Sequence, residues 1–319
     1  MRGQISLPLI TLICFVFGFT HSLRLSSNDK KYASYLIKFG YMERSSLVRS
    51  NKNWNVDDNI FREALKKFQN YVRNDATGIL DDATKRSMNL DRCQSKDTRE
   101  RRRKRYTSIG HWPKKHITYK IVKYSSSISQ KEVDSIIFLA FSVWSDHAGI
   151  TVTKRNGGRS DIEIKFEEIA PRLDSHIFGN TNSRHKTSVI TLNDGVQWSQ
   201  DFTTGLPNLF QTASHEIGHV LGLGHTDVIG AMMFPVYDLG IKIFSLHEDD
   251  VKGIQEIYSE VKAISYPGRI IYKKNANKFK TSFNDFKTHI SDAFDKFHQN
   301  ETADFTDLNL PEEFFSNGF

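Results

Sequence analysis

The feature that most constrains this chain is segment 213–225, which reads ASHEIGHVLGLGH. His215 and His219 lie four positions apart, so their side chains share one face of a helix and can reach one ion. Gly222 can adopt a positive φ at low cost, which lets the helix end and the chain turn back toward that face. The turn would bring His225 to the same ion. Three neutral imidazoles then hold zinc with one position open, which is the arrangement of a catalytic site rather than of a structural one.

Glu216 follows the first histidine and is not a ligand in this arrangement, so it can take the proton of zinc-bound water. On its own, an HExxH pattern is as often a pair of ordinary core or surface histidines as it is a metal site. The complete spacing HExxHxxGxxH, followed by Met233, is the metzincin signature and arises much less often by chance. It predicts a zinc-dependent peptidase with Glu216 as general base and Met233 beneath the metal, and it disfavours hydrolysis through a protein nucleophile.

Longer stretches resemble one branch of the metzincins, the matrix metalloproteinases or matrixins. The resemblance extends over about residues 32–260 and is carried by NLF at 208–210, AMMFPVY at 231–237 and DDVKGIQEIY at 249–258. Thr226 stands where the family usually has Ser. The resemblance implies an α+β fold, in which a metzincin catalytic domain with a twisted, mixed five-stranded sheet and three helices follows a three-helix prodomain.

The same resemblance implies a pocket for the substrate side chain that follows the cleaved bond, the S1′ pocket. Pro235 and Tyr237 would form its wall, and Gln211 would line its depth. Two alternatives remain open. Another metzincin, such as a sheddase-type protease, is disfavoured by FPVY at 234–237. A secreted decoy that binds inhibitors or matrix without cutting is disfavoured by the intact Glu216.

Residues 1–22 read as a secretory signal peptide. An apolar run at 5–19 follows Met1-Arg2 and is too short to span a bilayer comfortably, and small polar residues come next. The other interpretation, a buried N-terminal helix, lacks an amphipathic pattern. No later stretch has the apolar length of a membrane span, so a protein secreted to the extracellular space or matrix is expected. Cys93 would then be the sole cysteine, which excludes an intrachain disulfide framework.

Residues 23–105 are expected to form the propeptide. Apolar positions with helical spacing predict helices at 31–41 and 60–71, and a turn at 77–84 starts a third. This three-helix unit resembles the matrixin prodomain, which itself resembles a peptidoglycan-binding fold. We therefore assign it the prodomain role rather than cell-wall binding.

Segment 91–97, DRCQSKD, stands where the matrixins have the cysteine switch PRCGxPD. The thiolate of Cys93 is a strong zinc ligand that would fill the open position and exclude water and substrate until the propeptide leaves. Arg92 and Asp97 match the family, in which they pair across the loop. The residues that replace the two prolines and the glycine are Asp91, Lys96 and Gln94. Without those rigid and small residues the loop is less pre-organised, which predicts leaky latency.

The run RERRRKR at 99–105 is the most basic in the chain. In isolation such a run indicates a nuclear-localisation or polyanion-binding segment. Between the propeptide and the catalytic domain of a secreted chain, RRKR at 102–105 instead predicts cleavage by a furin-type convertase between Arg105 and Tyr106. Residues 106–264 would then be the catalytic domain.

The net charge of +7 comes from the part that is expected to be removed. Residues 1–105 hold 22 Lys+Arg and 11 Asp+Glu, whereas residues 106–319 hold 22 and 26. The part that would remain after cleavage, residues 106–319, is therefore slightly acidic, and no nucleic-acid partner is expected. The partners that the resemblance implies are extracellular protein substrates and tissue inhibitors of metalloproteinases.

The catalytic part shows strands and a helix in alternation. A helix is expected after a capping box formed by Ser129 and Glu132. Strands are predicted at 116–122, 150–153, 161–166 and 188–192.

The loop region that carries a structural zinc and calcium ions in matrixins departs from the family pattern. The position of the family's last structural-zinc histidine is Thr191, and the calcium carboxylates correspond to Asn193 and Val196. His176 and His185 remain, but a pair of loop histidines is more often exposed to solvent than bound to metal. One catalytic zinc is therefore expected without a second zinc, and calcium binding is not favoured.

Residues 265–319 form a C-terminal tail where many matrixins continue into a hemopexin-like propeller, so a short form is expected. Phenylalanines recur in the tail at steps of three and four, which predicts an amphipathic helix ending near a glycan-acceptor sequence at 300–302. We interpret its apolar face as packing on the catalytic domain, and a role at a partner or membrane surface stays open. Together these features predict a secreted zinc-dependent endopeptidase, made as a zymogen, that cleaves extracellular matrix or other extracellular proteins.

Overall fold

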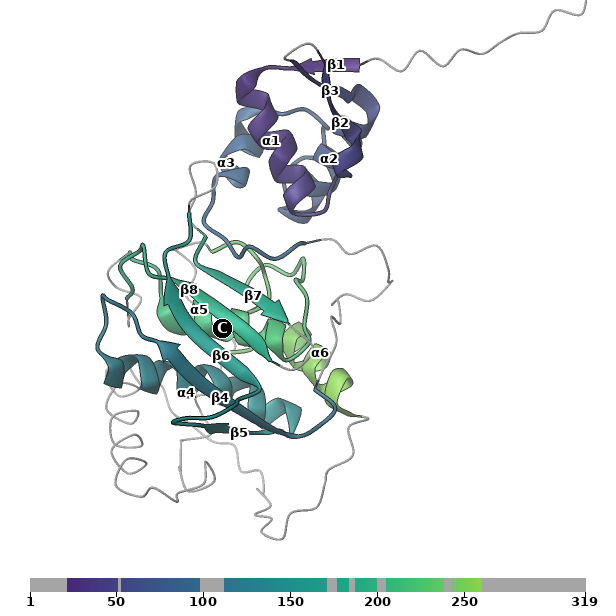
Figure 1. Ribbon diagram of the computed structural model, residues 1–319. Coiled ribbons are helices and arrows are strands. Elements are labelled where there is room, and N and C mark those ends of the chain that lie inside the picture. Colours follow the sequence, from purple (N-terminus) through teal and green to yellow (C-terminus); the bar gives the residue numbers. More distant parts are fainter. Residues whose placement is uncertain are drawn as a thin grey trace, which may run out of the picture.

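The computed structural model describes residues 22–50, 53–97, 112–170, 177–183, 187–199, 205–237, 243 and 245–259. Its helices and strands form two groups along the chain, a small one over residues 22–88 and a larger one over residues 116–259 (Figure 1). The segment that follows the small group, residues 89–97, runs onto the larger group and forms backbone hydrogen bonds with it.

Three helices form most of the small group, as predicted. Helix α1 spans Ser27–Lys38, α2 spans Asp58–Tyr71 and α3 spans Asp82–Met88. The side chains that cap their N-termini by accepting backbone N–H groups belong to Ser26, Asp57 and Asp81. Helix α1 begins earlier than the predicted 31–41 because Ser26 caps it, and the chain turns soon after its end at Gly40, whose φ is 90°.

A small antiparallel sheet accompanies these helices and was not predicted. Its strands are β1 (Ser22–Leu25), β2 (Leu47–Ser50) and β3 (Asn53–Asp57), in the order β1-β3-β2, and the 3-10 helix η1 (Arg44–Ser46) precedes β2. These strands have only four or five residues and include charged and amide side chains. Two of them, SLRL and NWNVD, do alternate polar and apolar residues, so a strand signal was present there and was overlooked; only LVRS lacks it.

The core of the small group lies between α1 and α2. Its fully buried apolar side chains include Leu36, Phe39, Leu65, Phe68 and Met88. The buried amide of Gln69 fixes the turn between α2 and α3, because it accepts a hydrogen bond from Gly78 N at 2.8 Å and donates one to Thr84 Oγ1 at 2.8 Å. The turn sets where the third helix begins, and with it the direction in which residues 89–97 leave.

The larger group contains a mixed five-stranded sheet, which confirms the predicted fold class. Its strands are β4 (His116–Lys123), β5 (Thr151–Lys154), β6 (Ile162–Glu167), β7 (Gly179–Ser183) and β8 (Ser188–Asn193). Their order is β5-β4-β6-β8-β7, and only the β7–β8 pair is antiparallel. Strand β7 was not predicted, because GNTNS has few residues that favour strands.

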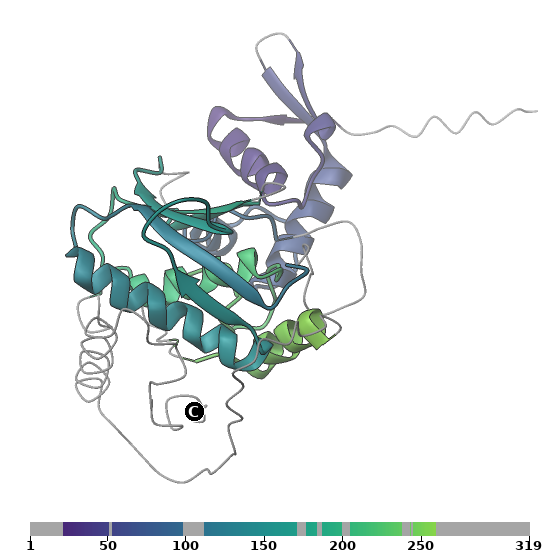
Figure 2. The same ribbon diagram turned by 60° about the horizontal axis from the view of Figure 1, so that its bottom comes forward.

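Three helices pack with this sheet. They are α4 (Gln130–Ala148), α5 (Leu209–Val220) and α6 (Glu248–Ser259). Helix α4 begins with the predicted capping box of Ser129 and Glu132. It lies along one face of the sheet (Figures 1 and 2) and shares one apolar core with α5, α6 and the strands. Trp144 of α4 is the largest fully buried side chain of that core.

Four predictions concern residues outside the described ranges. They are residues 1–21 of the predicted signal peptide, the processing site Arg105–Tyr106, the loop histidines His176 and His185, and the tail at 265–319. Within the described ranges, no helix has both the length and the apolar character needed to cross a membrane.

Candidate metal centre

Helix α5 presents two of the motif histidines from a fully buried backbone. Asn208 caps its N-terminus through its side chain, and the indole of Trp144 donates a hydrogen bond to the carbonyl of Ser214 at 2.8 Å. A Cβ added at Gly218 would lie 2.8 Å from the ring of Trp144 and would collide with the thioether of Met233. A glycine is therefore needed at this position, because two large side chains pack directly on the helix backbone between the histidines.

The three imidazoles are oriented by hydrogen bonds from their Nδ1 atoms. These bonds join His215 Nδ1 to Met232 O at 2.7 Å, His219 Nδ1 to Leu223 O at 2.8 Å and His225 Nδ1 to Asp97 Oδ1 at 2.9 Å. Carbonyl and carboxylate oxygens can only accept, so each Nδ1 carries the proton and each Nε2 presents a lone pair.

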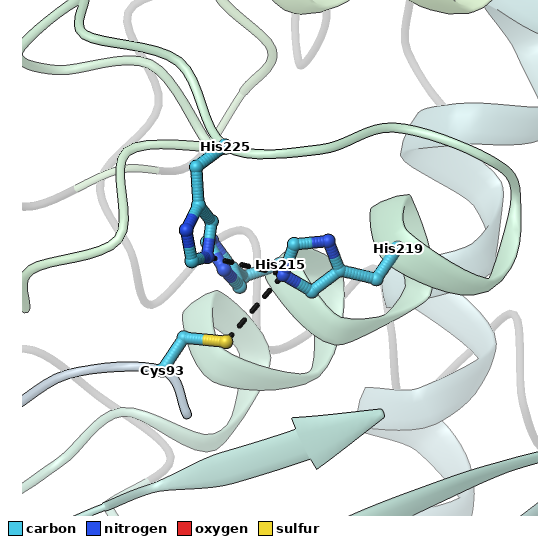
Figure 3. A group of neighbouring side chains, drawn as sticks. All are labelled: Cys93, His215, His219 and His225. Carbon is cyan, nitrogen blue, oxygen red and sulfur yellow. Dashed lines mark hydrogen bonds between the residues drawn. The ribbon is translucent and has the colours of Figure 1, made fainter. Parts of the chain in front are cut away.

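Those lone pairs converge on one point together with a sulfur atom (Figure 3). His219 Nε2 lies 3.2 Å from His225 Nε2 and 3.4 Å from Cys93 Sγ, and the four ligand atoms lie within 4.8 Å of one another. Nitrogen ligands about 2.0–2.1 Å from zinc in a tetrahedron are roughly 3.3 Å apart, so the spacing fits. His215 Nε2 has no hydrogen-bond partner among the described residues, which leaves a buried lone pair for a cation.

Burial sets the charge states of these ligands. Burial, followed by the neighbouring imidazoles of His219 and His225, lowers the pKa of His215 well below its ordinary value, so the ring is neutral as a ligand must be. Burial, followed by the Glu216 carboxylate, raises the pKa of the Cys93 thiol well above its ordinary value, so a cation is needed to hold it as a thiolate. Three imidazoles and one thiol are a donor set that suits zinc.

The carboxyl group of Glu216 is fully buried next to these ligand atoms. Burial raises its pKa to about 7, against the lowering effect of the hydroxyl of Thr181 and the nearby thiol of Cys93. Thr181 Oγ1 donates a hydrogen bond to Glu216 Oε2 at 2.6 Å. A carboxylate whose pKa lies near neutrality is suited to accept a proton and pass it on.

The turn after α5 returns the chain as predicted. Gly222 has a φ of 114°, and Thr226 N then donates a hydrogen bond to Met233 O at 3.1 Å. The carboxylate of Asp250 in α6 accepts hydrogen bonds from the N–H groups of Met232 at 2.8 Å and Met233 at 3.1 Å. Helix α6 thus braces the turn that places Met233 against α5 beneath the histidines.

Arg92 and Asp97 form a fully buried ion pair across the loop that carries Cys93. Asp97 Oδ1 accepts from both Arg92 and His225 Nδ1. Burial alone would raise the pKa of Asp97, but the Arg92 charge and the His225 hydrogen bond lower it to about 2. The carboxylate therefore stays ionised and connects the loop to one imidazole of the cluster.

An aromatic cradle at the C-terminal end of α1 surrounds this ion pair. The Arg92 guanidinium donates to the Tyr35 hydroxyl at 2.6 Å and lies 3.5 Å from the ring centroid of Phe39. The Tyr41 hydroxyl donates to Asp97 Oδ2 at 2.7 Å. The small group thus holds the loop through three side chains of segment 31–41, for which the sequence predicted a helix and no contact with the loop.

Residues 91–94 run extended between two backbone edges of the larger group. The hydrogen bonds are Cys93 N to Pro235 O at 3.0 Å, Gln94 N to Gly179 O at 3.2 Å, Tyr237 N to Asp91 O at 2.8 Å and Phe178 N to Arg92 O at 3.4 Å. One edge is residues 178–179 and the other is residues 235–237. The segment therefore lies like a short strand between them, with its thiol toward the histidines.

The structure brings together most of the residues singled out from the sequence. Those that gather around the ligand atoms are His215, His219, His225, Glu216, Cys93, Arg92, Asp97 and Met233. Pro235 and Tyr237 line the extended segment, and the ring of Tyr237 lies 5.6 Å from that of His215. Gln211 is buried in the first turn of α5, and its role in a pocket stays a prediction.

Sequence reasoning missed Thr181 and Gly179, the two β7 residues that approach Glu216. The run GNTNS gave no strand signal, so nothing in the sequence placed it beside α5. The aromatic cradle was missed for a different reason. Helical spacing identifies the buried face of a helix, but it does not identify the distant charged pair that the face covers.

The buried amide of Asn193 occupies one position where the family has a calcium carboxylate. Its Oδ1 accepts hydrogen bonds from Ile169 N at 2.9 Å and Gly195 N at 2.8 Å, and its Nδ2 donates to Ile177 O at 2.8 Å. Both lone pairs of Oδ1 are thereby used, and none is left for a cation. Thr191 lies in β8, paired with Asn180 of β7.

A helix with two histidine ligands, a turn that returns a third and a methionine segment beneath them, all beside a mixed sheet, define the metzincin class of zinc peptidases. Comparison with known proteins narrows the class. Residues 111–259 match the model of the matrixin family. Through this domain the chain belongs to the matrixins, which are zinc metalloproteases, and the resemblance found in the sequence is confirmed.

The chain is similar to several matrix metalloproteinases along most of its length. It is 31% identical to matrix metalloproteinase-19 of Mus musculus over 256 residues, which cover 78% of this chain and 48% of that protein. It is 32% identical to the Homo sapiens protein of the same name over 231 residues, or 71% and 45%. Stromelysin-1 of Mus musculus is 29% identical over 276 residues, or 81% and 55%. The chain spans about half the length of these relatives.

Proposed function

We propose that this protein is the secreted zymogen of a zinc-dependent endopeptidase that cleaves extracellular matrix or other extracellular proteins. The observation that carries the proposal is the convergence of three Nε2 lone pairs and one thiol on a single point beside a buried carboxylate. The relatives named as metalloproteinases, stromelysin and collagenase support the same reading.

His215, His219 and His225 would hold the catalytic zinc. Bound there, zinc would supply a Lewis acid that polarises the scissile carbonyl and makes a water molecule more acidic. Glu216 accepts the proton of the attacking water and later gives it to the leaving amine.

The extended segment 91–94 indicates how a peptide substrate would bind. It pairs its backbone with residues 178–179 on one side and residues 235–237 on the other. Once the segment has left, the same edges are free to pair with an extended peptide, which is the binding mode of strand addition. Pro235 and Tyr237 would then wall the S1′ pocket, with Gln211 deeper in it.

Latency rests on the propeptide, residues 23–105, and is removed by cleavage between Arg105 and Tyr106 by a furin-type convertase. In the latent form the Cys93 thiolate would be a fourth ligand of the zinc and would exclude water and substrate. The small group adds its own contacts: the Tyr71 hydroxyl donates to Thr226 O at 2.7 Å, and its ring stacks on Phe234 with centroids 6.3 Å apart. Residues 106–264 then act as the catalytic domain, with tissue inhibitors of metalloproteinases as further partners.

Peptide-library cleavage by the convertase-processed protein tests the proposal. Wild-type protein should cut peptides at defined bonds, and a zinc chelator should abolish the cutting. Processed protein that carries zinc but cuts no peptide in the library would contradict the peptidase function and would favour an inhibitor- or matrix-binding role instead.

A further inference from the structure

We propose that Thr181 is a positioning residue that fixes the carboxylate of Glu216 for proton transfer, and that Gly179 provides the space in which this carboxylate lies. The inference rests on the proposed peptidase function and adds strand β7 to its machinery. Strand β7 is an edge strand of the larger sheet and packs beside α5.

The first observation is the short hydrogen bond from Thr181 Oγ1 to Glu216 Oε2 at 2.6 Å. The same hydroxyl also lies 3.3 Å from the backbone carbonyl of Glu216. Since a hydroxyl has one proton, the shorter bond to the carboxylate is the stronger of the two. Glu216 Oε1 has no hydrogen bond of normal geometry from the described residues. One oxygen is thus held, and the other is left to take a proton.

The second observation is independent of that bond. A Cβ added at Gly179 would lie 2.6 Å from Cγ and Oε1 of Glu216 and 2.8 Å from its Cδ, closer than real side chains approach. Any larger residue at this position would push the carboxylate away. Gly179 and Thr181 are two positions apart on a strand, so both face the same side, toward Glu216.

Both partners of this contact stand on rigid elements. Strand β7 is registered against β8, with Gly179 opposite Leu192 and Thr181 opposite Ile190. Glu216 stands on α5, whose backbone is packed against Trp144 and Met233. A carboxylate clamped between two fixed elements keeps one rotamer, which is what a general base needs when small displacements cost rate.

The test compares Thr181→Val, Thr181→Ser and Thr181→Ala in the convertase-processed protein. Valine keeps the shape and removes the hydroxyl, so kcat should fall about 10- to 100-fold while KM stays within about twofold. Serine restores the hydroxyl and should keep kcat within about threefold of wild type. Thr191→Val, the same change on the neighbouring strand β8, is the control and should leave kcat unchanged.

Wild-type kcat in Thr181→Val, or a change confined to KM, would overturn the proposal. If the valine variant does not fold, the serine and alanine variants still isolate the hydroxyl, and equal kcat values in that pair would overturn it as well. If the wild-type protein cuts no peptide at all, the proposed peptidase function is wrong, and kcat cannot test the role of Thr181. The effect of Thr181 on the Glu216 carboxylate is then observed directly.

That observation is the carbon-13 signal of the Glu216 carboxyl carbon in the metal-free protein, assigned by its loss in Glu216→Gln. Thr181→Val should shift this signal and Thr181→Ser should leave it in place, because only valine removes the donor. A signal that is the same in all three proteins would show that the hydroxyl does not hold the carboxylate.

Discussion

The metal centre is assembled from two regions that are attached in different ways. On the catalytic side, His215 and His219 are oriented by backbone carbonyls of the same region. On the propeptide side, the Asp97 carboxylate orients His225, and Cys93 brings the thiol. Under the proposed zymogen mechanism, two of the three imidazoles would therefore keep their partners on release of the propeptide, whereas His225 would lose its partner together with the thiol.

The two regions also differ in what stabilises them. The catalytic side relies on backbone hydrogen bonds and on packing against Trp144 and Met233. The propeptide side relies on the buried ion pair of Arg92 and Asp97 inside an aromatic cradle. Breaking a buried ion pair by removing one partner typically costs about 3–5 kcal/mol, so changes on this side should affect latency before they affect chemistry.

The largest effect is expected on the catalytic side. Glu216→Ala in the processed protein should lower kcat by at least about 1,000-fold, because it removes the proton acceptor while leaving every metal ligand in place. Zinc content, measured by atomic emission, should stay at the wild-type level. Turnover that survives in a zinc-loaded variant would show that another group accepts the proton.

The second effect separates the propeptide side from the catalytic side. In a protein whose processing site is blocked by Arg105→Ala, Asp97→Ala leaves the Arg92 guanidinium buried without its carboxylate. This change should destabilise the closed switch loop by about 3 kcal/mol. The fraction of molecules whose loop has left the metal site, and with it the residual peptidase activity, should then rise by about 100-fold. Asp75→Ala, at an exposed position of the same group, is the control. If the Asp97→Ala protein has no peptidase activity, latency depends on the small group covering the site and not on the switch loop.

The third prediction uses pH to compare the catalytic side before and after processing. In the uncleaved protein, burial raises the pKa of Asp250 to about 6 despite hydrogen bonds from Met232 N, His247 N and Met233 N. The pKa of Asp250 in the folded protein lies above the unfolded value of 3.8, so the folded protein binds this proton more tightly than the unfolded chain does. The contribution of the protonated carboxyl group to stability is therefore fully present below about pH 4 and is lost as the pH rises through about 6.

The free energy of unfolding of wild-type zymogen should therefore fall by about 3 kcal/mol relative to Asp250→Asn between pH 4 and pH 7. Chemical denaturation at several pH values measures this difference. After processing, the new ammonium group of Tyr106 is expected to pair with Asp249 or Asp250, as the resemblance implies, and the dependence should shrink or reverse. The same dependence in both forms would contradict that rearrangement.

The smallest effect concerns the residues by which the switch loop departs from the family. Restoring Gly at 94 and Pro at 91 and 96 in the Arg105→Ala protein should lower its residual activity about tenfold. Each proline reduces the conformational entropy of the released loop and so stabilises the closed loop by about 0.4–1 kcal/mol. Cys93→Ser should raise that activity instead. Equal residual activity in the original and restored loops would show that the aromatic cradle already supplies the missing rigidity.

The sequence was most informative where chemistry depends on local spacing. The histidines, Glu216 and the Gly222 turn follow from one helix and one glycine, and the capped helices and the longer strands follow from periodicity. Strand β7 was missed because its five residues carry no apolar alternation and are held by pairing with β8 alone. For the same reason the contact between Thr181 and Glu216 was invisible, since it joins positions that only the sheet brings together.

X-ray absorption at the zinc edge tests the central claim most directly, that one zinc site is shared by three histidines of the catalytic region and one thiol of the propeptide. The uncleaved protein should contain one zinc per chain with three nitrogen neighbours and a single sulfur at about 2.3 Å. After processing and removal of the propeptide, the sulfur should disappear while the three nitrogens at about 2.0–2.1 Å remain. Uncleaved protein whose zinc has no sulfur neighbour, or whose nitrogen neighbours change on processing, would contradict the account.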